Sequence, residues 1–466
     1  MKIKNIIAAA LVGCSLAAAA DESPRYVFYF IGDGMGLNPV MTAETYNRTV
    51  LRTGKPLTML QFPVASWAMT YSASSRITDS AAAGTALSAG VKTKNSMLGM
   101  GPDTTAVTSV AADLYDRGWG VGIVTSVGAD DATPGAFYAH VPNRKHQYDI
   151  DIAAARSGYD FIAGAGLHGF VDKDGKPTDV EAVMADKGVQ IVRGRGGIDA
   201  ITSRRAVLLS EEERPTWNVG YTIDSIADAL TLQDLYIACL RQLERNGRDR
   251  FFMMVEGGNI DHALHGNDGG AAIKEIINFD KTLAMAYDFY LAHPDETLII
   301  VTADHDTGGS AMVHATDSLG GRTEPRLDLY DWQRVSKEAF SDYCKGVLKS
   351  RMNYTWSDMR AYLTEQLGFF DHVPVSAAQE EQLRRMFDET FLLRNTRDQE
   401  TLYASFNAFA VEVFRLLNDA AGVRFTSTSH SGMPVPVFAV GVGAERFAPV
   451  NNNIDIPARL RSILGI

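Results

Sequence analysis

The sequence predicts an α/β protein built around a mainly parallel sheet. Two observations support this expectation. Apolar runs typical of buried parallel strands recur along the chain, and segments with helical periodicity lie between them. The strand-like runs cover 26–36, 121–126, 251–258, 297–309 and 436–443, and the helical segments cover 104–117, 225–246 and 271–291.

Polar residues that can bind metal ions stand at the ends of these strand-like runs. Asp33 follows the first apolar run and Glu256 follows FFMMV, while Asp304 and His305 follow TLIIV. His430 precedes PVFAV. In an α/β fold the functional groups gather at the carboxyl ends of the strands. One such residue would be an ordinary loop residue, but five along one edge indicate a site.

The chain has 466 residues, with 46% apolar and 21% charged residues, which excludes a disordered or low-complexity protein. Lys and Arg number 44 and Asp and Glu number 56, so the net charge is −12. This charge argues against nucleic acid as the main partner. An anionic substrate is still allowed, because local metal ions or an arginine outweigh a diffuse surface charge.

Residues 1–20 have the features of a secretory signal peptide. Lys2 and Lys4 precede an uncharged stretch, and the small residues Ala18, Ala19 and Ala20 then form a cleavage site before Asp21. The same stretch contains LVGC, which resembles a bacterial lipobox and would make Cys14 the lipid-anchored first residue of the mature chain. Both processing routes remain open. Both predict export, either to the periplasm or as a membrane-anchored lipoprotein.

Residues 21–466 are expected to form one catalytic domain. A mostly helical insertion is expected at about 312–425, capping one end of the sheet, because 330–421 has helical patterns and no buried strands. No segment after the N-terminus has the character of a transmembrane helix. Cys239 and Cys344 are expected to be buried free thiols, although their spacing leaves a disulfide open.

The segment TDSAAAGTALSAG places Ser80 at the start of a helix. Its alanines have high helix propensity, and the free N–H groups at a helix start favour an anion. The small side chains that follow Ser80 let a phosphate approach closely. The alternative is that Ser80 only caps the helix, and this segment alone favours the cap because serine is a preferred capping residue.

Two further motifs, EGGNIDHALH and TADHDTGG, supply metal ligands. Asp261 and His265 are four residues apart, so on a helix they share one face and can reach one metal ion. Asp304 and His305 stand at the end of a buried strand, where a charge is costly unless it is paired or metal-bound. The alternatives are an acidic helix start and a structural ion pair. His430, in TSHSG, is a weak signal alone and gains weight as the third histidine.

The motif DDATPGAFYAHVPNR offers Asp131, Thr133 and Arg144. Aspartate and threonine oxygens suit Mg²⁺, and arginine suits bidentate binding of phosphate oxygens. A polar turn around Pro134 followed by a surface arginine is the alternative, and this motif alone does not exclude it.

Together the motifs supply enough ligands for two zinc ions and one magnesium ion beside a serine and an arginine. Mixed histidine and aspartate sets fit Zn²⁺ with an open position, and all-oxygen sets fit Mg²⁺. Two metals about 4 Å apart can clamp the entering and leaving oxygens of a phosphoryl transfer. The candidate ligands are Asp33, Thr133, Glu256, Asp261, His265, Asp304, His305 and His430.

These motifs resemble those of the alkaline phosphatases. FIGDGMG, TDSAAAGTA, DATPGAFYAHVPNR, MVEGGNIDHALH, TADHDTGG and TSHSG occur in that family's order, over about 26–145, 251–310 and 425–445. The resemblance implies a three-layer α/β sandwich that hydrolyses phosphate monoesters at alkaline pH with broad leaving-group tolerance. It also implies that Ser80 is the nucleophile that becomes a phosphoserine and that Arg144 clamps the phosphate.

The same resemblance implies how the metals are held. The first zinc would be held by Asp261, His265 and His430. The second zinc, facing Ser80 Oγ, would be held by Asp33, Asp304 and His305, and magnesium by Asp33, Thr133 and Glu256. Asp131 and His262 occupy positions that vary within the family, so their roles stay open. The expected partners are small-molecule phosphate monoesters and, as a further expectation, a second copy of the chain in a homodimer.

Two other functions remain as alternatives. A phosphodiesterase or another metallohydrolase of the wider superfamily would use similar metals, but a diester lacks the oxygen that Arg144 would bind. A non-enzymatic phosphate-binding protein of the cell surface would explain the anion-binding helix start. The complete ligand set and Ser80 argue against it.

Overall fold

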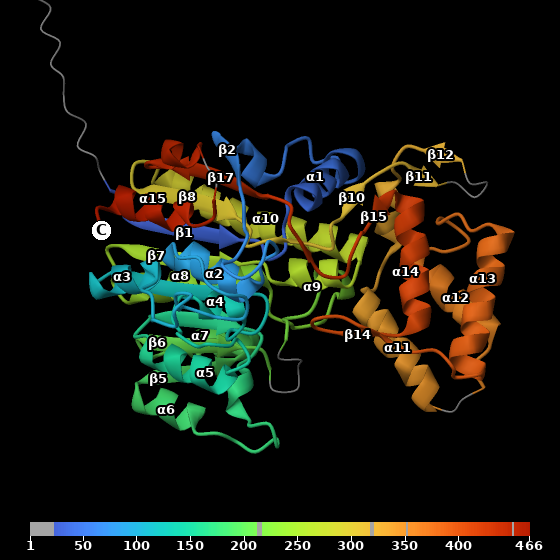
Figure 1. The fold of residues 1–466 in the computed structure, drawn as a ribbon, viewed down its shortest axis with the longest axis horizontal. Helices are drawn as coiled ribbons and strands as arrows, with labels where there is room; N and C mark the ends of the chain where they lie inside the picture. The colour runs from blue at the N-terminus through green and yellow to red at the C-terminus, as the bar shows by residue number, and fades with distance from the viewer. Residues whose placement is uncertain (1–22, 212–216, 317–320, 351–352, 450–451) are drawn as a thin grey trace, which may run out of the picture.

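The computed structural model describes residues 23–211, 217–316, 321–350, 353–449 and 452–466. The predicted signal peptide, with Cys14, lies outside these residues. A nine-stranded sheet crosses the molecule in the order β2-β17-β8-β1-β7-β3-β4-β6-β5 (Figure 1). Its strands are β1 (Tyr26–Ile31), β2 (Val64–Ala68), β3 (Gly120–Thr125), β4 (Phe161–Gly164), β5 (Val189–Arg193), β6 (Arg205–Leu209), β7 (Phe251–Glu256), β8 (Thr297–Thr302) and β17 (Val435–Gly441).

Helices and short strand pairs occupy the connections between these strands. The helices are α1 (Leu37–Tyr46), α2 (Ser80–Ala89), α3 (Val110–Asp116), α4 (Ala132–Gly135), α5 (Gln147–Arg156), α6 (Val180–Asp186), α7 (Gly194–Asp199), α8 (Leu232–Arg245), α9 (Asn259–His265), α10 (Gly269–Ala292), α11 (Lys337–Ser350), α12 (Trp356–Leu367), α13 (Ala377–Phe387), α14 (Ala408–Ala421) and α15 (Asp455–Leu464). The short strands are β9 (Asp306–Thr307), β10 (Ala311–Met312), β11 (Ala315–Thr316), β12 (Arg322–Thr323), β13 (Gln399–Glu400), β14 (Ser405–Phe406), β15 (Val423–Arg424) and β16 (His430–Ser431).

The centre of the sheet is parallel, as the sequence predicts. β1 pairs in parallel with β7 and β8, and parallel pairing continues through β3, β4, β6 and β5. The expectation of a parallel strand at 436–443 is wrong, because β17 runs antiparallel to β8 and to β2. This reversal puts the start of β17 at the edge where the parallel strands end. His430, which precedes β17, therefore reaches the same edge as Asp304.

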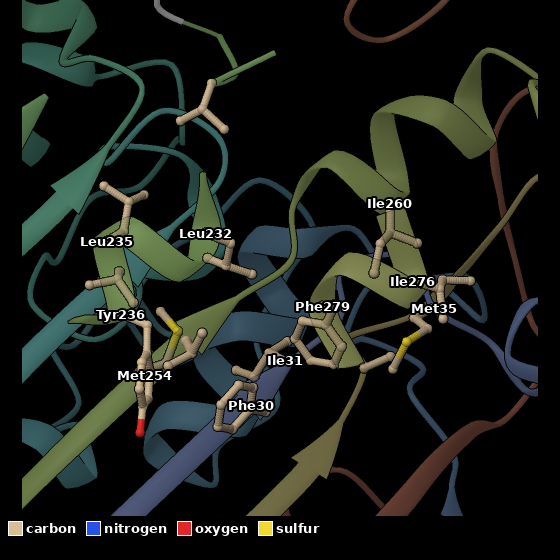
Figure 2. Close-up of a cluster of buried hydrophobic side chains, with 14 of the residues drawn as sticks. Phe30, Ile31, Met35, Leu232, Leu235, Tyr236, Met254, Ile260, Ile276 and Phe279 are labelled. Carbon is tan, nitrogen blue, oxygen red and sulfur yellow. The ribbon is translucent and has the colours of Figure 1, made fainter. Parts of the chain in front are cut away.

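Helices cover both faces of the sheet and make the three layers. Side chains alternate between the faces along β1. Phe30 packs edge-on against Phe279 of α10, with ring centroids 5.6 Å apart, in the apolar cluster beneath α8 and α10 (Figure 2). Tyr29 points to the opposite face, where its hydroxyl donates to the Leu87 carbonyl of α2 at 3.2 Å. The buried apolar strands therefore form the core of an α/β sandwich, which confirms the predicted fold class.

Two helices begin later than their periodicity predicts. α3 begins at Val110 rather than near 104, because the Ser109 hydroxyl accepts the Ala112 N–H at 3.1 Å and caps the helix. α8 begins at Leu232 rather than near 225, after a capping box formed by Thr231 and Asp234. Hydrophobic periodicity identifies the body of a helix, whereas the capping side chain fixes its first residue.

Residues 312–425 contain α11, α12, α13 and α14, which pack together beside the end of the sheet that carries α9 (Figure 1, orange). Phe340 and Phe409 are among the buried rings that hold these helices to one another. The group is joined to the sheet through Asp268, the capping residue of α10. Its carboxylate accepts from Gln333 Nε2 at 2.8 Å and from the Lys337 N–H at 2.7 Å.

Cys239 and Cys344 are both buried, and neither forms a disulfide, which confirms the expectation of free thiols. Among the helices of the described residues, none has both the length and the apolar character that crossing a bilayer requires.

Candidate active site

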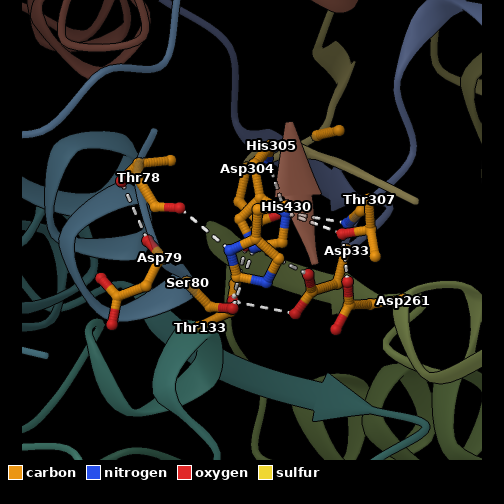
Figure 3. A network of polar contacts seen from close by, with 12 residues as sticks. Asp33, Thr78, Asp79, Ser80, Thr133, Asp261, Asp304, His305, Thr307 and His430 are labelled. Atoms are coloured by element: carbon orange, nitrogen blue, oxygen red, sulfur yellow. Dashed lines mark hydrogen bonds and ion pairs between the residues drawn. The ribbon is translucent and has the colours of Figure 1, made fainter. Parts of the chain in front are cut away.

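Ser80 is the first residue of α2 and is fully buried. The residue that caps the helix is Asp79, whose carboxylate accepts the Ala82 N–H at 3.0 Å. The alternative in which Ser80 serves only as the cap is therefore wrong. The second carboxylate oxygen of Asp79 accepts the Ser96 N–H at 2.8 Å, which ties the start of α2 to a neighbouring loop. The Ser80 hydroxyl itself faces His305, with Oγ 3.1 Å from Nε2 (Figure 3).

The hydrogen bonds around His305 define its tautomer. The Thr307 hydroxyl donates its one hydrogen to the Asp261 carboxylate. The same oxygen lies 3.1 Å from His305 Nδ1, and there it can only accept a hydrogen bond. Nδ1 therefore carries a hydrogen, and in the neutral ring Nε2 presents a lone pair. That lone pair lies 3.1 Å from Asp304 Oδ2 and 3.5 Å from Asp33 Oδ1, which are also electron-rich. A cation among these atoms removes their mutual repulsion.

The same reasoning applies to the other two histidines. His265 Nδ1 donates to the Thr428 carbonyl at 2.6 Å, and His430 Nδ1 donates to the Thr78 carbonyl at 2.9 Å. In the neutral rings both Nε2 atoms present lone pairs, and they face each other at 3.1 Å. Burial lowers the pKa of His430 to about 3, which keeps this ring neutral. Neutral imidazoles whose Nδ1 is held by a carbonyl are typical metal ligands.

The carboxylates of the site are buried together and lack enough protein partners. Asp33 Oδ1, Glu256 Oε1 and Asp261 Oδ2 are buried without a hydrogen-bond partner among the described residues. Burial, with the charges of Asp304, Asp261 and Glu256, raises the pKa of Asp33 well above its ordinary value. Burial likewise raises the pKa of Glu256 to about 8. Clustered buried carboxylates either bind protons or bind cations, so this donor set fits metal ions.

Among the described residues, two groups of side chains have ligand atoms within 4.8 Å of one another and could each hold a metal ion. They are Asp261, His265 and His430, and Asp33, Asp261 and His305. The first is the set predicted for the first zinc. The second shares Asp33 and His305 with the set predicted for the second zinc and adds Asp261, while Asp304 lies beside it at 3.1 Å from His305 Nε2.

The turn that carries Asp33 requires glycine. Gly34 has a φ of +70°, and a Cβ there would lie 2.7 Å from Asp261 Oδ1. Its N–H donates to Asp304 Oδ1 at 3.0 Å. A side chain at this position would therefore push apart the loops that bring the two groups of ligands together.

Thr133 and Glu256 form an oxygen-rich corner next to Asp33. The Thr133 hydroxyl lies 3.5 Å from Asp33 Oδ2, and it also contacts the Glu256 carboxylate. A second hydroxyl, that of Thr125, donates to Glu256 Oε2. This corner contains only oxygen donors, which suits Mg²⁺.

Arg144 lies at the side of the site and binds Asp131. Its Nη2 donates to Asp131 Oδ1, and Asp131 also caps α4, the short helix that contains Thr133. The backbone N–H of Arg144 donates to the Ser96 carbonyl at 2.8 Å. Since Asp79 binds the Ser96 N–H, the arginine and the start of the Ser80 helix are fastened to the same loop residue.

Tyr403 is a site residue that the sequence does not predict. It comes from the helical insertion, its hydroxyl accepts from Arg144 Nη2 at 3.1 Å, and its ring stacks on His262. No motif surrounds this tyrosine, so no signal in the sequence distinguishes it from other aromatic residues. His262 lies directly behind Asp261 on α9, and burial lowers its pKa to about 4.

Comparisons with known proteins show the family of this chain. A family model described as alkaline phosphatase matches residues 25–169 and 216–466. Alkaline phosphatase 4 of Bacillus subtilis is 27% identical over 448 residues, which cover 92% of this chain and 87% of that protein. A cold-active alkaline phosphatase from a psychrophilic Shewanella species has a TM-score of 0.77 at 25% identity, covering 94% of this chain and 99% of its own. The Thermus thermophilus alkaline phosphatase has a TM-score of 0.76 at 26% identity, covering 98% and 96%.

The matched segments include every residue that the sequence predicts for the site, from Asp33 to His430. Within the unmatched internal segment, 170–215, the described residues 170–211 form strands and helices at the far edge of the sheet. The match covers most of the chain, and this chain belongs to the alkaline phosphatase family, whose members are phosphoric monoester hydrolases.

Proposed function

We propose that this protein hydrolyses phosphate monoesters by way of a phosphoserine at Ser80. The observation that carries the proposal is the arrangement around the Ser80 hydroxyl. Imidazole nitrogens and buried carboxylate oxygens without hydrogen-bond partners among the described residues converge there, at the positively polarised start of a helix.

The donor set supports two zinc ions and one magnesium ion. Asp261, His265 and His430 would hold one zinc, Asp33, Asp304 and His305 the other, and Asp33, Thr133 and Glu256 the magnesium. When bound, the zinc ions supply the Lewis acidity that activates oxygen nucleophiles and stabilises leaving oxygens.

The residues of the chain position the reaction. Ser80 Oγ forms a bond to phosphorus while the ester oxygen departs with the alcohol, and water then attacks the same phosphorus and restores the serine. The N–H groups in the first turn of α2 stabilise the negative phosphoryl group bonded to its first residue. Arg144 holds two phosphoryl oxygens, and Asp131 orients its guanidinium. Positioning and electrostatics of this kind account for most of the catalysis of phosphoryl transfer.

The test compares turnover of p-nitrophenyl phosphate and of bis-p-nitrophenyl phosphate. Monoester turnover should be the faster, and Ser80→Ala should abolish it while inorganic phosphate still binds. Faster diester turnover would overturn the monoesterase assignment. A wild-type protein that binds phosphate without any turnover would instead be a binding protein, and a Ser80→Ala variant that keeps wild-type turnover would exclude the phosphoserine.

We also infer that the chain is exported, to the periplasm or as a lipoprotein anchored at Cys14, and that it assembles as a homodimer. The charged N-terminus and the small residues before Asp21 support export. The mass of the N-terminal peptide of the mature protein distinguishes cleavage after Ala20 from lipidation at Cys14, and an uncleaved Met1 refutes export. Light scattering gives the mass of the assembly.

A further inference from the structure

Tyr403 reaches the site from the turn between β13 and β14. The turn is closed by a hydrogen bond from the Thr401 N–H to the Ala404 carbonyl at 2.9 Å, which places Tyr403 at its tip. The phenol ring stacks on His262 with centroids 3.9 Å apart, and it meets His265 edge-on at 5.4 Å. Arg144 Nη2 donates to its hydroxyl at 3.1 Å. The insertion thus places one neutral acceptor directly on the phosphate-binding arginine.

The contact with Tyr403 limits how Arg144 can bind phosphate, because Nη2 has only two hydrogens. Nη2 carries two hydrogens, and both are used, one on Asp131 Oδ1 and the other on the Tyr403 hydroxyl. A guanidinium binds phosphate in a bidentate manner through two neighbouring nitrogens, either Nε with Nη2 or Nη1 with Nη2. Nη2 belongs to both pairs. A bidentate grip on phosphate therefore requires Nη2 to release one of its two present partners.

We propose that the Tyr403 hydroxyl holds the place of a phosphoryl oxygen on Arg144 Nη2 and is displaced when phosphate binds. The proposal rests on the proposed function, in which Arg144 clamps the phosphoryl group. Tyr403 is in this sense a positioning residue, because it acts on phosphate through the arginine.

Charge decides which partner leaves. The contact between Arg144 and Asp131 joins two opposite charges that are both largely buried, with side chains 17% and 9% exposed. The Tyr403 hydroxyl is an uncharged acceptor, as phenols are below about pH 10. Hydrogen bonds between charged partners are stronger than those to a neutral oxygen. A phosphate dianion therefore displaces the tyrosine and leaves the aspartate in place.

Breaking the hydrogen bond between Arg144 and Tyr403 costs free energy, and this cost makes phosphate binding less favourable. The wild-type protein should therefore hold inorganic phosphate more weakly than a variant that lacks the hydroxyl but keeps the ring. Because inorganic phosphate is also the product, this contact favours product release.

The experiment measures competitive inhibition of monoester turnover by inorganic phosphate in the metal-loaded enzyme. Tyr403→Phe removes the acceptor and keeps the ring on His262. The inhibition constant should fall about three- to tenfold, which is the value of one ordinary hydrogen bond. The matched control is Tyr343→Phe, which removes a hydroxyl in α11 that is bonded to the Tyr354 hydroxyl at 2.7 Å, away from the site. It should leave the inhibition constant unchanged.

A second background tests the route of the effect. In Arg144→Ala, the Tyr403→Phe substitution should no longer change the inhibition constant, because the hydroxyl then has no arginine to occupy. An unchanged or raised inhibition constant in Tyr403→Phe alone overturns the inference, since a tyrosine that merely supports the site would weaken phosphate binding when truncated. Absence of monoester turnover in the wild-type protein would refute the proposed function instead, so the two failures are distinguishable.

Discussion

Asp79 should contribute to stability in two ways, and its substitution measures both. One carboxylate oxygen caps α2 through the Ala82 N–H, and the other accepts the Ser96 N–H. Loss of an N-cap costs about 1 kcal/mol, and loss of a second hydrogen bond to a partly buried N–H costs about another 1 kcal/mol. We therefore expect Asp79→Ala to lower the free energy of unfolding by about 2 kcal/mol. Asp79→Ser, which can still cap the helix, should lose about half as much.

Urea unfolding of the metal-loaded protein measures these differences from the shift of the transition midpoint. Thr355→Ala is a matched control, because Thr355 caps α12 in the insertion and its loss should cost about 1 kcal/mol. Phosphate binding should weaken in Asp79→Ala but not in Thr355→Ala, since Ser96 also accepts the backbone N–H of Arg144. A loss in Asp79→Ala no larger than that of the Thr355 control, or an equal loss in Asp79→Ser, would refute the two-bond account.

Three further predictions concern the metals, magnesium binding and pH. Chelation should abolish turnover and lower the unfolding temperature, because the buried carboxylates lose their cations. Adding zinc with magnesium should restore both. Full activity after exhaustive EDTA treatment would exclude the metal sites. Glu256→Gln should lose most of the bound magnesium in elemental analysis and keep the zinc, whereas equal loss of both metals would place Glu256 elsewhere. Burial lowers the pKa of Lys337 from 10.5 to about 8. Between these two pH values the unfolded chain binds more protons than the folded one, so the free energy of unfolding should rise with pH. The rise should be about 3 kcal/mol relative to Lys337→Met. Parallel curves of unfolding free energy against pH for the two proteins would contradict this.

The sequence predicts the sheet and most of the site because both depend on short contiguous motifs. Asp33, Glu256 and Asp304 follow buried apolar strands, and parallel strands bring their ends to one edge, so proximity follows from the fold class alone. His430 is different, because it precedes its strand. It reaches the edge only because β17 runs antiparallel, and an apolar run carries no information about its direction.

The features that the sequence does not reveal depend on single side chains in loops. Asp79 and Ser80 are adjacent and both are good capping residues, so propensity alone cannot tell which one caps and which one is free. Tyr403 reaches Arg144 across 259 residues of sequence from a turn with no motif. Contacts of this kind are set by the packing of the insertion against the sheet, which periodicity does not describe.

The insertion contacts the candidate active site at more than one place. The loop directly after His265 is held by it: Lys337 Nζ donates to the Gly266 carbonyl and Asn418 Nδ2 donates to the Asn267 carbonyl, each at 2.8 Å. Since His265 ends α9, any shift of this loop moves a ligand of the first predicted zinc. From the same insertion, Tyr403 contacts Arg144, the predicted phosphate clamp. Changes in the helical segment should therefore alter metal and phosphate binding together, although the segment supplies none of the predicted ligands.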